Sequence, residues 1–337
     1  MSSTRPFKQH NRGNSHVVAL LVTAISIAAA LVLLVNRQYV VDQLTVWQYQ
    51  PIGAVTQLAS RSGMNDTGKF YFYASQPAIE TAPTFNKECG RKEESTAILG
   101  CYNGRNIYIY NVTNEKLDGI KEVTAAHEML HAAYVRMSNG EKKTVDKLLE
   151  AEYAKLKNNK EFAERFAFYD RTEPGERDNE LHSVIGTEVS AVSPELEAHY
   201  RNYFSNRSKV LALHDKYASV FAELQAEGDE LSKQLTALGD TIDQQTKDYN
   251  TAVTTLNNDI EDFNRRANSG GFSSKEEFDS ERAVLLTRAN QLEDIRQTIN
   301  AEVTQYNTLR ERLKSVASQS EALNRSIDST LAPAPNL

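Results

Sequence analysis

The chain has 337 residues, of which 40% are hydrophobic and 25% charged, enough for two or three structural units. Its net charge of −7, with no basic stripe along the sequence, argues against a nucleic-acid-binding protein. Its seven histidines and two cysteines are few enough for their positions to be informative.

An apolar segment near the N-terminus is long enough to cross a membrane. Val17–Val35 is interrupted only by Thr23 and Ser26, and about 20 such residues in a helix cross a bilayer core of about 30 Å. The alternative is a cleaved signal peptide, whose apolar region normally runs about 7–15 residues before a small-residue site. This segment is longer, so residues 17–36 are predicted to form an uncleaved anchor.

Positive charge lies almost entirely on one side of this segment. Arg5, Lys8 and Arg12 precede it, and only Arg37 follows closely. The positive-inside rule therefore makes residues 1–16 a cytoplasmic tail. We expect a single-pass cell-membrane protein whose remaining residues are extracytoplasmic.

After a juxtamembrane linker at 37–49, residues 50–205 carry mixed patterns. A short helical pattern at 51–65 is followed by the aromatic run Phe70–Tyr73, which favours a strand. Asn103-Gly104 between two apolar runs predicts a β-hairpin. Further helices are expected at 117–137, 141–157, 160–169 and 179–190, the last capped by Asp178, and after Ser193-Pro194. Residues 50–205 are thus predicted to be one α+β, mainly helical domain.

Cys89 and Cys101 are the only cysteines, and both lie in the part predicted to be exported. An oxidising compartment and an even count favour a disulfide between them. The alternative is two separate small core residues.

His127-Glu128-Met129-Leu130-His131 is an HExxH sequence within the Ala-rich segment Ile120–Tyr134. Residues four apart share a helix face, so both imidazoles can reach one metal ion, with Glu128 beside them. Two neutral nitrogen ligands, one open position and a carboxylate base are typical of a hydrolytic zinc site. The motif predicts that one Zn²⁺ ion is bound.

A catalytic zinc needs a third protein ligand, and the candidates lie at 179–188. HExxH with a glutamate on a later helix resembles the gluzincin branch of the zinc metallopeptidases. Asn179-Glu180-Leu181-His182-Ser183 matches the start of the Asn-Glu-x-x-Ser-Asp sequence found in thermolysin-type members, with Val184 in place of the Asp. The resemblance covers only these two motifs and implies a zincin-like domain with Glu180 as third ligand.

Helix geometry leaves the alternatives open. At 100° per residue, His182 points about 160° away from Glu180, while Glu188 lies about 80° away. Glu188 is therefore an alternative ligand or a neighbour of the ligands, and His182 is the third candidate.

In the implied mechanism, Glu128 is the general base for a zinc-activated water that attacks a peptide carbonyl. His182 and Tyr134 are candidate donors to the developing oxyanion. Two interpretations of the strand Ile107–Tyr110 stay open: it offers an edge on which a peptide substrate adds as an extra strand, or it is a core strand of the hairpin.

Beyond Asn206, apolar residues recur at alternating spacings of three and four. This heptad pattern predicts a coiled-coil helical hairpin at 206–330, with a turn near 267–274 and a flexible tail at 331–337. The second arm is the most regular, with Leu292, Ile295, Ile299, Glu302, Tyr306, Leu309, Leu313, Val316, Ser320, Leu323 and Ile327. Such a hairpin is expected to be a spacer or an arm for a protein partner or self-association.

Three functions fit these features. The first is a membrane-anchored extracytoplasmic zinc metallopeptidase acting on a peptide or protein. The second is a catalytically weak, zincin-derived scaffold whose coiled coil binds an envelope partner. The third is a cell-wall amidase, because zinc chemistry also cleaves other amides. The intact Glu128 favours the first, and the sequence leaves the substrate and the oligomeric state open.

Overall fold

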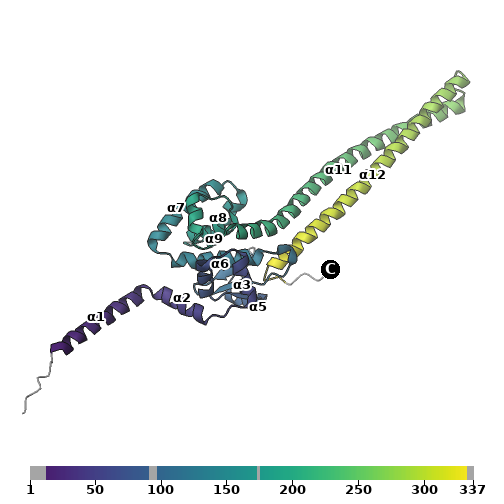
Figure 1. Cartoon of the computed structure of the whole chain (residues 1–337). Coiled ribbons are helices and arrows are strands. Elements are labelled where there is room, and N and C mark those ends of the chain that lie inside the picture. Colours follow the sequence, from purple (N-terminus) through teal and green to yellow (C-terminus); the bar gives the residue numbers. More distant parts are fainter. Residues whose placement is uncertain (1–12, 91–96, 173–174, 332–337) are drawn as a thin grey trace, which may run out of the picture. The chain divides into compact units, whose positions relative to one another are not determined.

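The computed structural model describes residues 13–90, 97–172 and 175–331, so much of the predicted tails at 1–16 and 331–337 lies outside the described residues. The chain forms two compact units. One runs to Tyr217 and takes in the chain again from Ile327, and the other contains Ala218–Ser326. Helices dominate both, with three short strands in the first, which confirms the mainly helical class (Figure 1).

The apolar N-terminal segment forms helix α1 (Gly13–Val35). Within it, Val17–Val35 contains no buried residue and is the one span in the described residues long and apolar enough to cross a membrane. Asn36, with φ −100° and ψ 18°, separates α1 from α2 (Arg37–Gln48). Part of the predicted linker is therefore helical, and α2 packs against α4 (Asp66–Ala74).

The predicted strand at Phe70–Tyr73 is wrong, because these residues belong to α4. Asn65 caps this helix, its Oδ1 accepting a hydrogen bond from the Gly68 amide at 3.0 Å. Phe72 is fully buried in the core, to which α3 (Gly53–Arg61) contributes Val55 and Leu58. Tertiary packing and a good cap thus override the strand preference of aromatic residues.

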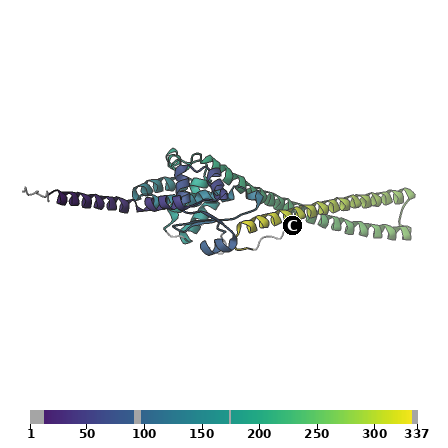
Figure 2. The ribbon, with the colours of Figure 1, turned by 60° about the horizontal axis from the view of Figure 1, so that its bottom comes forward.

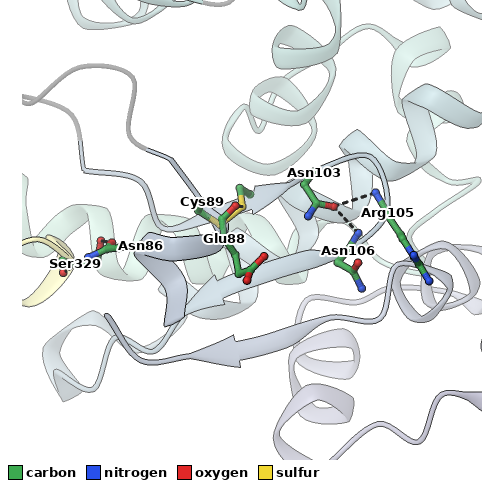
Figure 3. The surroundings of a disulfide bond; sticks show 8 residues. Asn86, Glu88, Cys89, Asn103, Arg105, Asn106 and Ser329 are labelled. Atoms are coloured by element: carbon green, nitrogen blue, oxygen red, sulfur yellow. Dashed lines mark hydrogen bonds between the residues drawn. A yellow bond between two sulfur atoms is a disulfide. The ribbon is translucent and has the colours of Figure 1, made fainter. Parts of the chain in front are cut away.

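The sheet has the order β1-β3-β2, from β1 (Ala78–Glu80), β2 (Gly100–Tyr102) and β3 (Ile107–Tyr110). β2 and β3 are antiparallel, which confirms the hairpin, and β1 is parallel to β3. In the turn, Asn103 Oδ1 accepts from the amides of Arg105 and Asn106 (Figure 3). Of the two interpretations of β3, the core strand is confirmed and the open edge is wrong, since β1 and β2 pair with both of its sides.

The predicted disulfide is confirmed. Cys89, at the end of α5 (Ala82–Glu88), is bonded to Cys101 in β2, with the two Cα atoms 5.8 Å apart (Figure 3). The disulfide links the edge strand β2 covalently to the end of helix α5, which precedes it in the chain.

Five helices complete the first unit's core. They are α6 (Ile120–Arg136), α7 (Asn139–Leu156), α8 (Lys160–Thr172), α9 (Arg177–Glu188) and α10 (Pro194–Tyr200), after the short 3-10 helix η1 (Glu115–Leu117). These positions confirm the helices expected there. Asp178 lies in the first turn of α9 rather than at its cap, which is Glu176.

Two later segments also belong to the first unit. The start of α11 (Ser208–Ser269) reaches it through Lys216, whose Nζ lies 2.8 Å from Asp118 Oδ2. After α12 (Lys275–Ile327), the backbone oxygen of Ser329 accepts a hydrogen bond from Asn86 Nδ2 at 2.8 Å (Figure 3). The chain segments on both sides of the second unit therefore belong to the first unit.

In the second unit, α11 and α12 lie side by side and run in opposite directions (Figure 2). Side-chain contacts join them at successive levels: Glu227–Arg312, Gln245–Glu302, Asp259–Arg288 and Arg266–Glu281. Close to the turn at 270–274, the rings of Phe263, Phe272 and Phe278 pack together.

Candidate metal centre

Helix α6 places His127 and His131 one turn apart, with their Nε2 atoms 3.0 Å from each other. The small residues around them, Ala125, Ala126, Ala132 and Ala133, are almost completely buried. On the facing helix α9, a Cβ at Gly186 would come within 2.5 Å of Leu130 Cδ1. Small residues on both helices thus allow the close contact of α6 with α9.

This contact brings Glu180 of α9 to both histidines. Its Oε1 lies 3.5 Å from His131 Nε2, and its Oε2 lies 3.8 Å from His127 Nε2. A tetrahedral ion with bonds of about 2.0–2.1 Å holds its ligand atoms roughly 3.3 Å apart. The three distances lie close to that value, and all three ligand atoms are within 4.8 Å of one another. His127, His131 and Glu180 form a group that could hold a metal ion.

A chain of hydrogen bonds orients His131. Asn179 Nδ2 donates to Glu176 Oε2 at 3.0 Å, which turns the amide oxygen of Asn179 towards His131. That oxygen lies 3.0 Å from His131 Nδ1. An amide oxygen only accepts, so Nδ1 carries the proton and Nε2 presents its lone pair to the ligand group.

The surroundings also keep His127 in its ligand form. Burial lowers the pKa of His127 well below its ordinary value, and His131 and the Arg165 guanidinium lower it further. Metal ions bind neutral imidazole, so this shift favours metal binding over protonation.

Glu128 lies beside the ligand group and against strand β2. It is 5% exposed, and a Cβ at Gly100 would come within 2.7 Å of Glu128 Oε1 and 2.5 Å of Thr124 Cγ2. Only glycine at position 100 lets the strand lie this close to the carboxylate.

The other candidates for the third ligand lie elsewhere. Glu188 Oε2 is 2.5 Å from Arg165 Nη1 and 3.6 Å from His214 Nε2. His182 is fully buried, with its Nε2 2.9 Å from His199 Nε2. Glu180 is therefore the candidate that the fold places at the histidines.

Neither expected oxyanion donor faces the ligand group in a way that fits this role. The buried His182 bonds to His199, and the Tyr134 hydroxyl donates to Asp146 Oδ1 at 2.8 Å. The Tyr134 hydroxyl gives its hydrogen to Asp146, and His182 is fully buried, so neither side chain is placed to donate to a substrate.

Helix α8 supplies two neighbours that sequence reasoning missed. Burial and the carboxylates of Glu180, Glu188 and Glu128 raise the pKa of Tyr169, so its hydroxyl stays protonated at neutral pH. Arg165, four residues earlier, bonds Glu188. Their spacing of four places both on one helix face, which is the signal that could have indicated them.

Comparisons of the whole chain with protein families, with curated proteins and with solved structures find no match.

Proposed function

We propose that the protein is a membrane-anchored extracytoplasmic zinc metallopeptidase. The observation that carries the proposal is the convergence of His127, His131 and Glu180 with the carboxylate of Glu128 beside them. Two imidazoles and one carboxylate are a common ligand set of hydrolytic zinc. The proposed topology places residues 1–16 in the cytoplasm, as the distribution of positive charge indicates.

When bound, zinc supplies a Lewis acid that polarises the substrate carbonyl and lowers the pKa of a water molecule. Glu128 accepts the proton of the attacking water and delivers it to the leaving nitrogen. The protonated hydroxyl of Tyr169, whose pKa the carboxylates of Glu180 and Glu128 raise, is the proposed donor to the developing oxyanion, in place of His182 and Tyr134.

We further propose that the substrate peptide aligns along β2. Among the described strands, β2 pairs only with β3, and Gly100 in β2 lies against Glu128. A peptide that adds to the other edge of β2 gains main-chain hydrogen bonds and passes next to the general base.

The test uses the full chain in detergent or lipid nanodiscs. We expect one bound zinc per chain and cleavage of a peptide library that is lost in Glu128→Gln and kept in Glu115→Gln. Equal cleavage by the wild type and Glu128→Gln would overturn the peptidase proposal. Zinc binding without any cleavage would instead support the scaffold function, in which the long helices α11 and α12 engage a protein partner.

Two matched variants test the assignment of Glu180 as the third metal ligand. Glu180→Ala should lose bound metal, whereas Glu188→Ala should keep it, because the Glu188 carboxylate is held by Arg165. Loss of metal in Glu188→Ala alone would contradict the assignment. For the topology, a reporter fused after residue 45 should be active only outside the cytoplasm.

A further inference from the structure

Helix α2 packs on the first unit with its polar side. Asp42 is 3% exposed and bonds Arg136 of α6. Tyr49, directly after the helix, donates from its hydroxyl to the Pro77 carbonyl at 2.6 Å. The inward face of α2 is therefore fixed to the folded unit by polar contacts.

The outward face of α2 is apolar. Val41, Leu44 and Trp47 are 56%, 47% and 70% exposed. At 100° per residue, these three side chains fall within an arc of about 120°. A surface helix of a water-soluble protein normally shows the reverse pattern, with its apolar stripe turned to the core.

Exposed apolar side chains concentrate at this place. Outside α1, the described residues of the first unit hold seven large apolar side chains that are widely exposed: Tyr39, Val41, Leu44, Trp47, Ile52, Val135 and Leu331. Five of the seven lie between positions 39 and 52. A concentration of this kind marks an interaction surface, whereas scattered single residues do not.

We propose that Val41, Leu44, Trp47 and Ile52 form a membrane-contact face, with which the folded unit rests on the surface of the bilayer that α1 enters. The face is continuous with the span, because α2 begins two residues after Val35. Trp is the side chain preferred at the level of the lipid headgroups. Exposed Arg37, at the start of α2, suits anionic headgroups.

The depth of Trp47 relative to the bilayer depends on whether α2 lies parallel to the membrane surface or continues along the membrane normal. If α2 continued along the membrane normal from Val35, twelve residues would place Trp47 roughly 18 Å beyond the span. An interfacial helix instead buries its apolar face about 5–10 Å into the boundary between headgroups and acyl chains.

Trp47 is the only tryptophan of the chain, so its fluorescence reports on this face alone. The experiment uses the full chain reconstituted in phosphatidylcholine–phosphatidylglycerol vesicles. We expect strong quenching of Trp47 by phospholipids brominated near the glycerol end of their acyl chains, and weak quenching by acrylamide from the water. Strong acrylamide quenching without bromolipid quenching would place the face in water and overturn the proposal. Protection from both quenchers would show that a protein or a second copy covers the face, which also overturns it.

Two double variants test whether the quenching of Trp47 depends on the apolar side chains of this face or on exposed apolar side chains anywhere in the chain. Val41→Ser with Leu44→Ser should clearly reduce bromolipid quenching, while thermal unfolding and disulfide formation stay unchanged because both side chains lie outside the core. The matched control is Val284→Ser with Leu286→Ser in α12. Val284 is 56% exposed and Leu286 is 52% exposed. This control should leave the quenching of Trp47 unchanged. The proposal rests on the membrane anchoring by α1 that the proposed function includes, but no readout depends on peptidase activity, so failure of the peptidase proposal leaves this result unaffected.

Discussion

Asp42 of α2 and Arg136 of α6 form a two-pronged ion pair. Asp42 Oδ2 accepts from Arg136 Nε and Asp42 Oδ1 from Arg136 Nη2, each at 2.8 Å, and the two side chains are only 4% and 6% exposed. Arg136 lies five residues after His131 on the same helix. The helix that carries the candidate metal ligands is thus joined directly to the helix that follows the candidate membrane span.

Removal of Asp42 should strongly destabilise the first unit. Asp42→Ala leaves the buried guanidinium without its carboxylate, and breaking a buried pair in this way costs about 3–5 kcal/mol. The free energy of unfolding can be measured in urea by circular dichroism. The control Glu164→Ala removes an exposed pair with Lys160 and should cost less than about 1 kcal/mol. Equal losses in the two variants would contradict the prediction.

Asn179→Ala should weaken metal binding without removing a ligand. The variant releases the proton-bearing Nδ1 of His131 from the oxygen that orients the ring, and changes of this kind typically lower metal affinity about 10–100-fold. A zinc titration against a competing chelator measures the effect. Asn103→Ala, in the β-hairpin turn, makes the same change away from the ligands and should keep full affinity.

Gly100→Ala should impair chemistry while sparing metal binding. The new methyl group would collide with Glu128 and Thr124 and shift the carboxylate. A misplacement of about 1 Å can cost 10²-fold in rate, so we expect peptide cleavage to fall by about that factor at unchanged zinc content. Gly53→Ala, where nothing lies within 4 Å of the added Cβ, is the control and should retain activity. Loss of zinc in Gly100→Ala would show that the strand supports the ligands rather than the base.

Acid should destabilise the metal-free protein through His199. Burial lowers the pKa of His199 to about 4, although the Glu141 carboxylate acts to raise it, whereas an unfolded histidine has a pKa of about 6.5. Between pH 6.5 and pH 4 the unfolded state binds a proton that the folded state does not, so stability falls as the pH falls. For this group the slope is about 1.4 kcal/mol per pH unit.

The check is urea unfolding of the chelator-treated protein at several pH values. His199→Gln should give a shallower decline of stability than the wild type over this range. An identical pH dependence in both proteins would mean that His199 is not kept neutral by the fold.

Local patterns predicted much of the fold. The 3.6-residue periodicities located α6 to α10, Asn103-Gly104 located the hairpin, and the number and setting of the cysteines gave the disulfide. The prediction of a strand at Phe70–Tyr73 was wrong. The strand preference of aromatic residues depends on what they pack against, and here they pack within a group of helices. Asn65 also caps the helix α4 in which they lie.

The candidate site was predictable only where its residues share a helix. The spacing of His127 and His131 follows from one turn of α6. The choice among Glu180, Glu188 and His182 depended on how α9 packs on α6. Small residues such as Ala125 and Gly186 allow this packing, but their presence in the sequence does not predict it. Gly100 approaches Glu128 from strand β2, and Glu128 raises the pKa of Tyr169 on α8; both relationships arise only from the assembled fold.

The hydrogen bond between Ser329 and Asn86 has a consequence for biosynthesis. The two residues are 243 positions apart. At 5–20 residues per second, a ribosome needs roughly 12–50 s to pass from one to the other. Both cysteines and all the candidate metal ligands are made within that interval, whereas this contact of their unit forms only at its end. The first unit therefore completes its fold only after nearly the whole chain has been synthesised.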